Sequence, residues 1–144
     1  MPLADPSMLD HARDLAIAYA LAFPIGWDRE REDRSAGLRT FPLVAIAACG
    51  FLQAASGVVR DDPQAVARIL EGLITGIGFI GAGAIIRSGR HVHGTATAAG
   101  LWATAAIGAA CALGAYEVAV VLAVATVATL RGLRMFKPDR DGSR

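Results

Sequence analysis

Two stretches without a single charged residue set the architecture of this chain: FPLVAIAACGFLQAASGVV (residues 41–59) and TATAAGLWATAAIGAACALGA (residues 95–115). They are 19 and 21 residues long, and about 20 apolar residues of helix cross the hydrocarbon core of a bilayer. Each stretch therefore predicts a membrane-spanning helix. The composition agrees, since 19% of the 144 residues are charged, against roughly a quarter in an ordinary soluble domain.

Three further apolar segments complete the expected set of helices. Residues 69–86 contain one charge, Glu71, and residues 118–130 are uncharged after a break around Gly114. Residues 15–27 give only about 20 Å of helix at 1.5 Å per residue, so this segment would span only by tilting, by thinning the bilayer or by using its polar end. We therefore predict an all-α, polytopic bundle of about five short helices that forms a single domain over residues 1–144.

The basic residues predict how this bundle is oriented. With five spans, the connections on one side carry eleven Lys and Arg residues and those on the other side carry three. Cytoplasmic loops carry the excess of these residues. We therefore place the loops 28–40 and 87–94 and the C-terminus in the cytoplasm, and only the N-terminus changes side if the first segment does not span.

Glycines are concentrated in the third apolar segment. Gly72 and Gly76 form a small-xxx-small pair, and Gly78, Gly81 and Gly83 follow them. Helices in lipid associate through close backbone packing, which small residues permit, so the pattern predicts a central helix. The alternative is an unwound helix that exposes carbonyl groups to an ion, as in transporters with broken helices.

A run of alternating charges, DREREDR (residues 28–34), directly follows the first apolar segment, and Arg39 immediately precedes the second one. An ordinary solvated loop would account for the charges alone. At a membrane boundary, however, unpaired charge is costly. At that position Asp28 and Arg29 have three possible roles. They would hold helix ends together, bind a hard cation through carboxylate oxygen or present a guanidinium group to an anion.

Other classes of site have little support in the sequence. His91 and His93 lack a third ligand, so we predict no metal site, and Cys49 and Cys111 lie in apolar runs, as expected of inert buried thiols. The net charge of +1 does not provide the basic field that nucleic-acid binding needs. The GxGxxG spacing within GIGFIG (residues 76–81) lies inside an apolar segment instead of a strand-to-helix turn. We expect no enzymatic activity, no cofactor and no nucleic-acid partner.

Short motifs lie in a fixed order between Gly26 and Tyr116. They are Gly26, Asp28 and Arg29; Arg34, Ala36, Gly37, Leu38, Arg39 and Thr40; Asp62 and Arg68; the run GIGFIGAG (residues 76–83); and Gly94, Thr97, Ala98, Ala99, Leu101 and Trp102. Together they resemble the MgtC/SapB family of bacterial inner-membrane proteins. The resemblance implies a compact helical membrane domain linked to adaptation to low magnesium and, in pathogens, to survival inside macrophages. The family has been discussed both as transport-associated and as a regulator of other membrane proteins.

Four departures from the family pattern bear on function. Asp28 replaces the usual glutamate, which keeps the charge and shortens its reach. Gly72 stands where the third span often has a glutamine, and the connection between Asp62 and Arg68 is longer than usual. Many members continue into a soluble cytoplasmic domain, whereas about 14 residues follow the last predicted span here. The resemblance is therefore to a short form without that domain.

These observations predict a non-enzymatic protein of the bacterial cytoplasmic membrane. We expect it to act in magnesium-linked stress adaptation, and in virulence in pathogens, by binding and modulating another membrane protein. The expected charge network comprises Asp28, Arg29, Arg34, Arg39, Asp62 and Arg68, and the expected motif and packing residues are Gly37, Thr40, Gly76, Gly78, Gly81, Gly83, Thr97 and Trp102. The alternative is a homo-oligomeric channel or transporter for a cation such as magnesium, although Gln53, Ser56 and Thr75 offer few polar groups for a path through the membrane.

Overall fold

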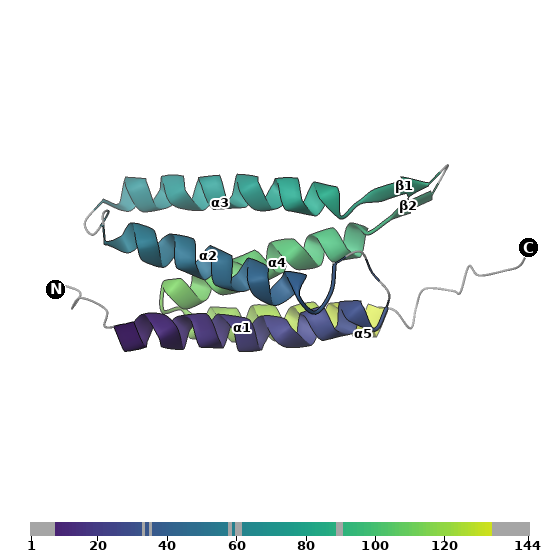
Figure 1. Ribbon diagram of the computed structural model, residues 1–144, viewed down its shortest axis with the longest axis horizontal. Helices are drawn as coiled ribbons and strands as arrows, with labels where there is room; N and C mark the ends of the chain where they lie inside the picture. Colours follow the sequence, from purple (N-terminus) through teal and green to yellow (C-terminus); the bar gives the residue numbers. More distant parts are fainter. Residues whose placement is uncertain are drawn as a thin grey trace, which may run out of the picture.

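Five helices run up and down in sequence order through the described part of the chain, and a short hairpin joins two of them (Figure 1). This computed structural model describes residues 8–32, 34, 36–57, 59, 62–88 and 91–133. The elements are α1 (Met8–Glu30), α2 (Thr40–Ser56), α3 (Pro63–Gly83), β1 (Ile86–Ser88), β2 (His91–His93), α4 (Thr95–Ala112) and α5 (Tyr116–Gly132). The predicted all-α bundle is confirmed.

Helix α4 forms the centre of the bundle, because it packs against all four of the other helices. More than half of it, 56%, is buried, and its buried residues are mostly alanine, glycine and threonine. Such small side chains let helix backbones approach one another closely. The tightest packing of this protein is therefore built around α4.

Two glycines of α4 show how closely this helix approaches α2. A Cβ atom at Gly108 would lie 2.1 Å from the carbonyl oxygen of Ala45, and one at Gly100 would lie 3.2 Å from the ring of Phe41. With Thr104 between them, small residues recur at every fourth position of α4. This spacing indicates a surface for close packing, but Gly72 and Gly76 of α3 have the same spacing, so it does not by itself identify the central helix.

Helix α3 lies at the edge of the bundle instead of at its centre. Only 11% of its membrane-length window is buried, and a Cβ atom at Gly72, Gly76, Gly78 or Gly83 would meet nothing within 4 Å. Gly81 alone among these glycines approaches α4, where Ala98 would lie 3.6 Å from its Cβ atom. The central position predicted from the glycines is wrong for the single chain, since small residues permit close packing but do not specify the partner helix. The helix is also continuous, so it has no unwound segment.

Helix α1 is longer than its apolar segment predicted. It contains 23 residues, or about 35 Å at 1.5 Å per residue, which is enough to cross a hydrocarbon core of about 30 Å. The first helix is therefore longer than the predicted segment, and Pro24 lies inside it. The apolar segment underestimated the helix because Asp14 and Asp28 are buried within it, where they pair with neighbouring arginines of α1 and with residues of other helices.

The connection between α3 and α4, predicted as a loop, is a two-stranded antiparallel hairpin in which Ile86 pairs with His93 and Arg87 pairs with Val92. The hairpin leads into α4 through Gly94, which has a φ of +87°. A Cβ atom at Gly94 would lie 2.0 Å from the carbonyl oxygen of Ala84. Only glycine fits this turn, because both the backbone conformation and the available space exclude a side chain.

By length and composition, α3 and α4 are the two described helices that qualify as membrane spans, with mean hydropathies of 1.5 and 1.3. The apolar helix α2 is slightly shorter, at 17 residues. Helix α3 exposes large apolar side chains that include Ile74, Phe79 and Ile80. Such a surface is suited to lipid or to another helix rather than to water.

Candidate functional site

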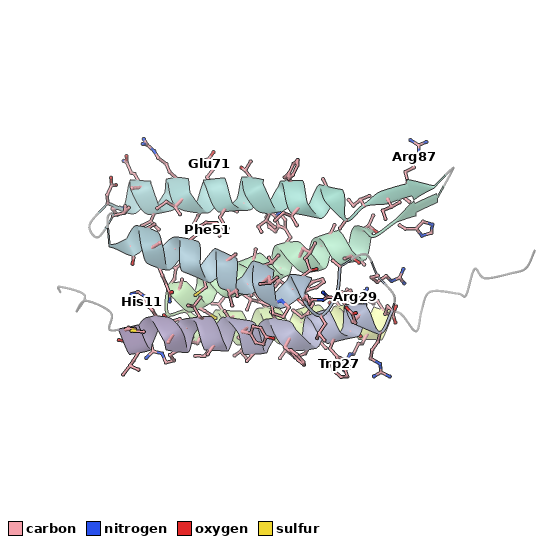
Figure 2. The ribbon with its side chains drawn as sticks, in the orientation of Figure 1. His11, Trp27, Arg29, Phe51, Glu71 and Arg87 are labelled. Atoms are coloured by element: carbon pink, nitrogen blue, oxygen red, sulfur yellow. The ribbon has the colours of Figure 1, made fainter. Side chains whose placement is uncertain are left out.

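Most of the charged motif residues lie at one end of the bundle. The C-terminal ends of α1, α3 and α5, the N-terminal ends of α2 and α4, and the hairpin meet there (Figure 1). Figure 2 shows Arg29 and Arg87 toward this end and His11 at the opposite one. We call the first end the hairpin end and the second the Asp14 end.

Asp28 is the centre of the ion pairs at the hairpin end. This residue is 8% exposed, and its Oδ2 atom accepts hydrogen bonds from Nε of Arg29, at 3.2 Å, and from Nη2 of the same residue. Its Oδ1 atom accepts a hydrogen bond from Nε of Arg131, at 3.1 Å. Because each carboxylate oxygen has a cationic donor, Asp28 links the last turns of α1 and α5 through charge-assisted hydrogen bonds.

Arg131 is a site residue that sequence reasoning missed. It contributed only to the count of basic residues, although it forms an ion pair with Asp28, which lies 103 residues earlier in the chain. The basic residue in the last turn of α5 is also favourably placed beside the helix dipole. A basic residue in the last turn of a helix predicts a favourable interaction with that helix end. It does not predict which carboxylate the residue pairs with.

Glu30 and Gly37 determine the shape of the connection between α1 and α2. The Oε2 atom of Glu30 accepts a hydrogen bond from the backbone N–H of Leu38, at 2.9 Å. A Cβ atom at Gly37 would collide with the same oxygen and lie 3.2 Å from the Cα atom of Glu30, so a side chain there would displace the Glu30 carboxylate from Leu38. The connection then enters α2 through the N–H of Thr40, which donates to the carbonyl oxygen of Gly37 at 3.0 Å.

Neither Arg34 nor Arg39 pairs with Asp28 in the structure, so this part of the predicted six-residue network is corrected. Arg34 pairs with Glu32 at 3.3 Å, and it lines, with Arg29 and the first turn of α4, a cavity of about 80 Å³. Thr97, which is 1% exposed, belongs to this cavity. Arg39 is exposed and lines a different and larger cavity, between α2 and α3.

Asp62 and Arg68 lie at the Asp14 end and are separate from the Asp28 ion pairs. Asp62 is the N-cap of α3, since its Oδ1 atom accepts hydrogen bonds from the N–H groups of Gln64 and Ala65, at 2.9 and 3.2 Å. Arg68 is an exposed residue in the second turn of the same helix. Their inclusion in one network with Asp28 is therefore wrong, because α3 begins at the far end of the bundle (Figure 1).

Trp102 lies on α4 and faces α3. It is 49% exposed and lines one cavity with Gly78 and Gly81 of α3, and a second one with Leu70 and neighbouring residues of α3. The indole ring thus fills part of the space that the glycines of α3 leave open.

A second polar cluster, which sequence reasoning missed, lies at the Asp14 end. Asp14 is 8% exposed and accepts hydrogen bonds from the hydroxyl of Tyr116, at 2.6 Å, and from Nε2 of Gln53, at 3.3 Å. Arg13 pairs with the same carboxylate at 3.1 Å, and its guanidinium carbon lies 5.7 Å from the centroid of the Tyr116 ring. This cluster joins α1, α2 and α5.

Neither cluster has the composition of a metal centre. No group of three His, Cys, Asp or Glu residues is placed to hold a metal ion within the described ranges. Cys49 and Cys111 are buried free thiols, as predicted. The polar chemistry of the bundle is therefore that of ion pairs and hydrogen bonds between helix ends.

A helical bundle with an apolar outer surface and ionic clusters at its two ends is the architecture of a polytopic membrane protein. The sequence model of the MgtC family matches residues 15–138, and the chain belongs to that family. It is 39% identical over 117 residues to Protein MgtC of Salmonella typhimurium (strain 14028s / SGSC 2262), an alignment that covers 81% of this chain and 49% of that protein. It is 42% identical over 122 residues to Protein MgtC of Brucella abortus (strain 2308), covering 83% and 50%. The chain thus spans about half the length of these relatives. No solved structure matches it.

Proposed function

We propose that this protein acts in the bacterial cytoplasmic membrane as a non-enzymatic regulator under magnesium limitation, by binding and modulating another membrane protein. In this proposal the hairpin end faces the cytoplasm, which the excess of basic residues on that side supports. A contribution to virulence applies where the host bacterium is a pathogen, as the family resemblance implies.

The observation that carries this proposal is the apolar interior of the bundle between its two ionic ends. Among the described residues, the buried polar side chains are those of Asp14, Asp28, Arg29, Thr97 and Thr104. Of these, only Thr104 lies well away from both ends, and its hydroxyl donates to the carbonyl oxygen of Gly100 at 2.8 Å. A path for a hydrated cation needs polar groups along its length. The interior of one chain therefore favours a regulator over a transporter.

The edge position of α3 supports the binding of a protein partner. The face of this helix next to α4 borders an open apolar cavity, and its glycines leave room for close approach. Transmembrane helices associate through such small-residue surfaces. A membrane partner, or a second copy of this chain, would bury them.

Replacement of Asp28 by Asn tests the role of the ionic cluster. We expect this variant to insert into the membrane at the normal level but to fail to restore growth in low magnesium to a strain that lacks the protein. Glu117→Gln is the matched control, because Glu117 is an exposed carboxylate in the first turn of α5. Normal complementation by Asp28→Asn would contradict the proposal.

Magnesium flux distinguishes the regulator from the transporter. Purified protein in proteoliposomes is expected to give no more flux than empty vesicles. Flux that Asp28→Asn abolishes would overturn the proposal in favour of a channel or carrier. If there is no flux, crosslinking from the exposed face of α3 is the direct route to the partner.

A further inference from the structure

An open groove lies between α2 and α3 and has a volume of about 710 Å³. Its walls are apolar and include Leu43 and Phe51 of α2 and Ile69, Leu73 and Ile77 of α3. Phe51 lies between the two helices in Figure 2. The volume lies within the roughly 300–1,000 Å³ of ordinary ligand pockets.

The groove exists because α3 presents glycines where bulky side chains would otherwise fill the space. Gly72 and Gly76 line it, and a Cβ atom at either position would meet nothing within 4 Å. The open volume is therefore determined by the sequence of α3.

One end of the groove is cationic. Arg39 and Thr40 line it at the hairpin end. Arg39 is exposed, and its guanidinium group has no hydrogen-bond or ion-pair partner among the described residues. A second cavity beside α3, of about 330 Å³, is lined by Leu70, Ile74 and further apolar residues and has no charged residue in its wall. The groove between α2 and α3 thus combines an apolar channel with an unpaired guanidinium group.

The length of the groove matches one leaflet of a bilayer. Thr40 and Phe51 line its wall on α2, and eleven residues of helix rise about 17 Å. Half of a hydrocarbon core is about 15 Å. An arginine at the boundary is therefore level with lipid phosphates while the groove extends through the acyl region of the same leaflet.

From this geometry we infer that the groove binds an anionic phospholipid, with its phosphate at Arg39 and one acyl chain between α2 and α3. Guanidinium groups bind phosphate through paired hydrogen bonds, and anionic lipids are enriched in the cytoplasmic leaflet. The inference depends on the proposed placement of the hairpin end in the cytoplasm, but it does not depend on the proposed protein partner.

Native mass spectrometry of the full chain in detergent, titrated with phosphatidylglycerol or phosphatidylcholine, tests the inference. We expect one tightly bound phosphatidylglycerol per chain and an affinity at least tenfold lower for phosphatidylcholine. Arg39→Gln should remove this preference for phosphatidylglycerol. The matched control is Arg68→Gln, which removes an exposed arginine that does not line the groove and should bind as the unmodified protein does.

A second variant tests the acyl channel separately from the headgroup. Gly76→Leu places a side chain in open space and should weaken the binding of phosphatidylglycerol at least tenfold, with an unchanged circular dichroism spectrum. Any of three results would overturn the inference. Arg39→Gln and Arg68→Gln could lose affinity for phosphatidylglycerol equally, the protein could bind both lipids equally, or a dimer could exclude lipid from the groove. If Gly76→Leu fails to fold, the comparison of the two arginine variants decides alone. All of these readouts are independent of growth in low magnesium, so the inference and the proposed function can fail separately.

Discussion

At the scale of single residues, the two arginines that bind Asp28 differ in what they contribute. The side chain of Arg29 is 5% exposed, and that of Arg131 is 55% exposed. Loss of one partner from a buried ion pair costs about 3–5 kcal/mol, whereas an exposed pair contributes about 0–1 kcal/mol. We therefore expect Arg29→Gln to lower the free energy of unfolding by several kcal/mol and Arg131→Gln by less than about 1 kcal/mol. Thermal unfolding in detergent, followed by circular dichroism, measures both, and equal losses would show that burial does not govern this cluster.

The two buried carboxylates also show what sequence could reveal about single residues. Asp14, Ala18, Ala22 and Ile25 are all buried on α1, at the spacing of one helix face, so Asp14 was recognisable as an inward-facing residue. The first apolar segment, taken to begin at residue 15, left Asp14 out, and this periodicity was missed. Its partners Gln53 and Tyr116, however, come from other helices. Their identity depends on how α1, α2 and α5 pack, which a single sequence does not specify.

At the scale of helices, the packing of α2 on α4 and the exposure of α3 give a matched pair of substitutions. Gly108→Ala places a methyl group 2.1 Å from the carbonyl oxygen of Ala45, and overpacking of this kind costs about 1–3 kcal/mol or more. Gly76→Ala meets nothing within 4 Å and should be neutral or slightly stabilising, because alanine is the better helix former. Thermal unfolding of both variants in the same detergent is the measurement. Destabilisation by Gly76→Ala comparable to that by Gly108→Ala would show that α3 is packed against a second chain.

Helix positions were more predictable than helix partners. The uncharged stretches 41–59 and 95–115 correspond closely to α2 and α4, because an apolar run of membrane length has few alternatives to a helix. The extra turns of α1 and α3 were missed, since polar residues such as Asp14 and Gln64 end an apolar run without ending a helix. The glycines of α3 indicated a surface for close packing, but which helix covers them depends on the tertiary arrangement.

At the scale of the whole molecule, the orientation of the bundle is open to a direct measurement. Cys49 and Cys111 are both 0% exposed, so a cysteine introduced at the surface should react with an impermeant thiol reagent above a low background. Gln64 lies in the exposed first turn of α3 at the Asp14 end, and Val92 is 55% exposed on the hairpin. With the hairpin end in the cytoplasm, Gln64→Cys should be labelled in intact spheroplasts and Val92→Cys only after the membrane is permeabilised. The reverse pattern would contradict the rule that basic residues remain inside, and it would place Arg39 and the lipid groove in the opposite leaflet.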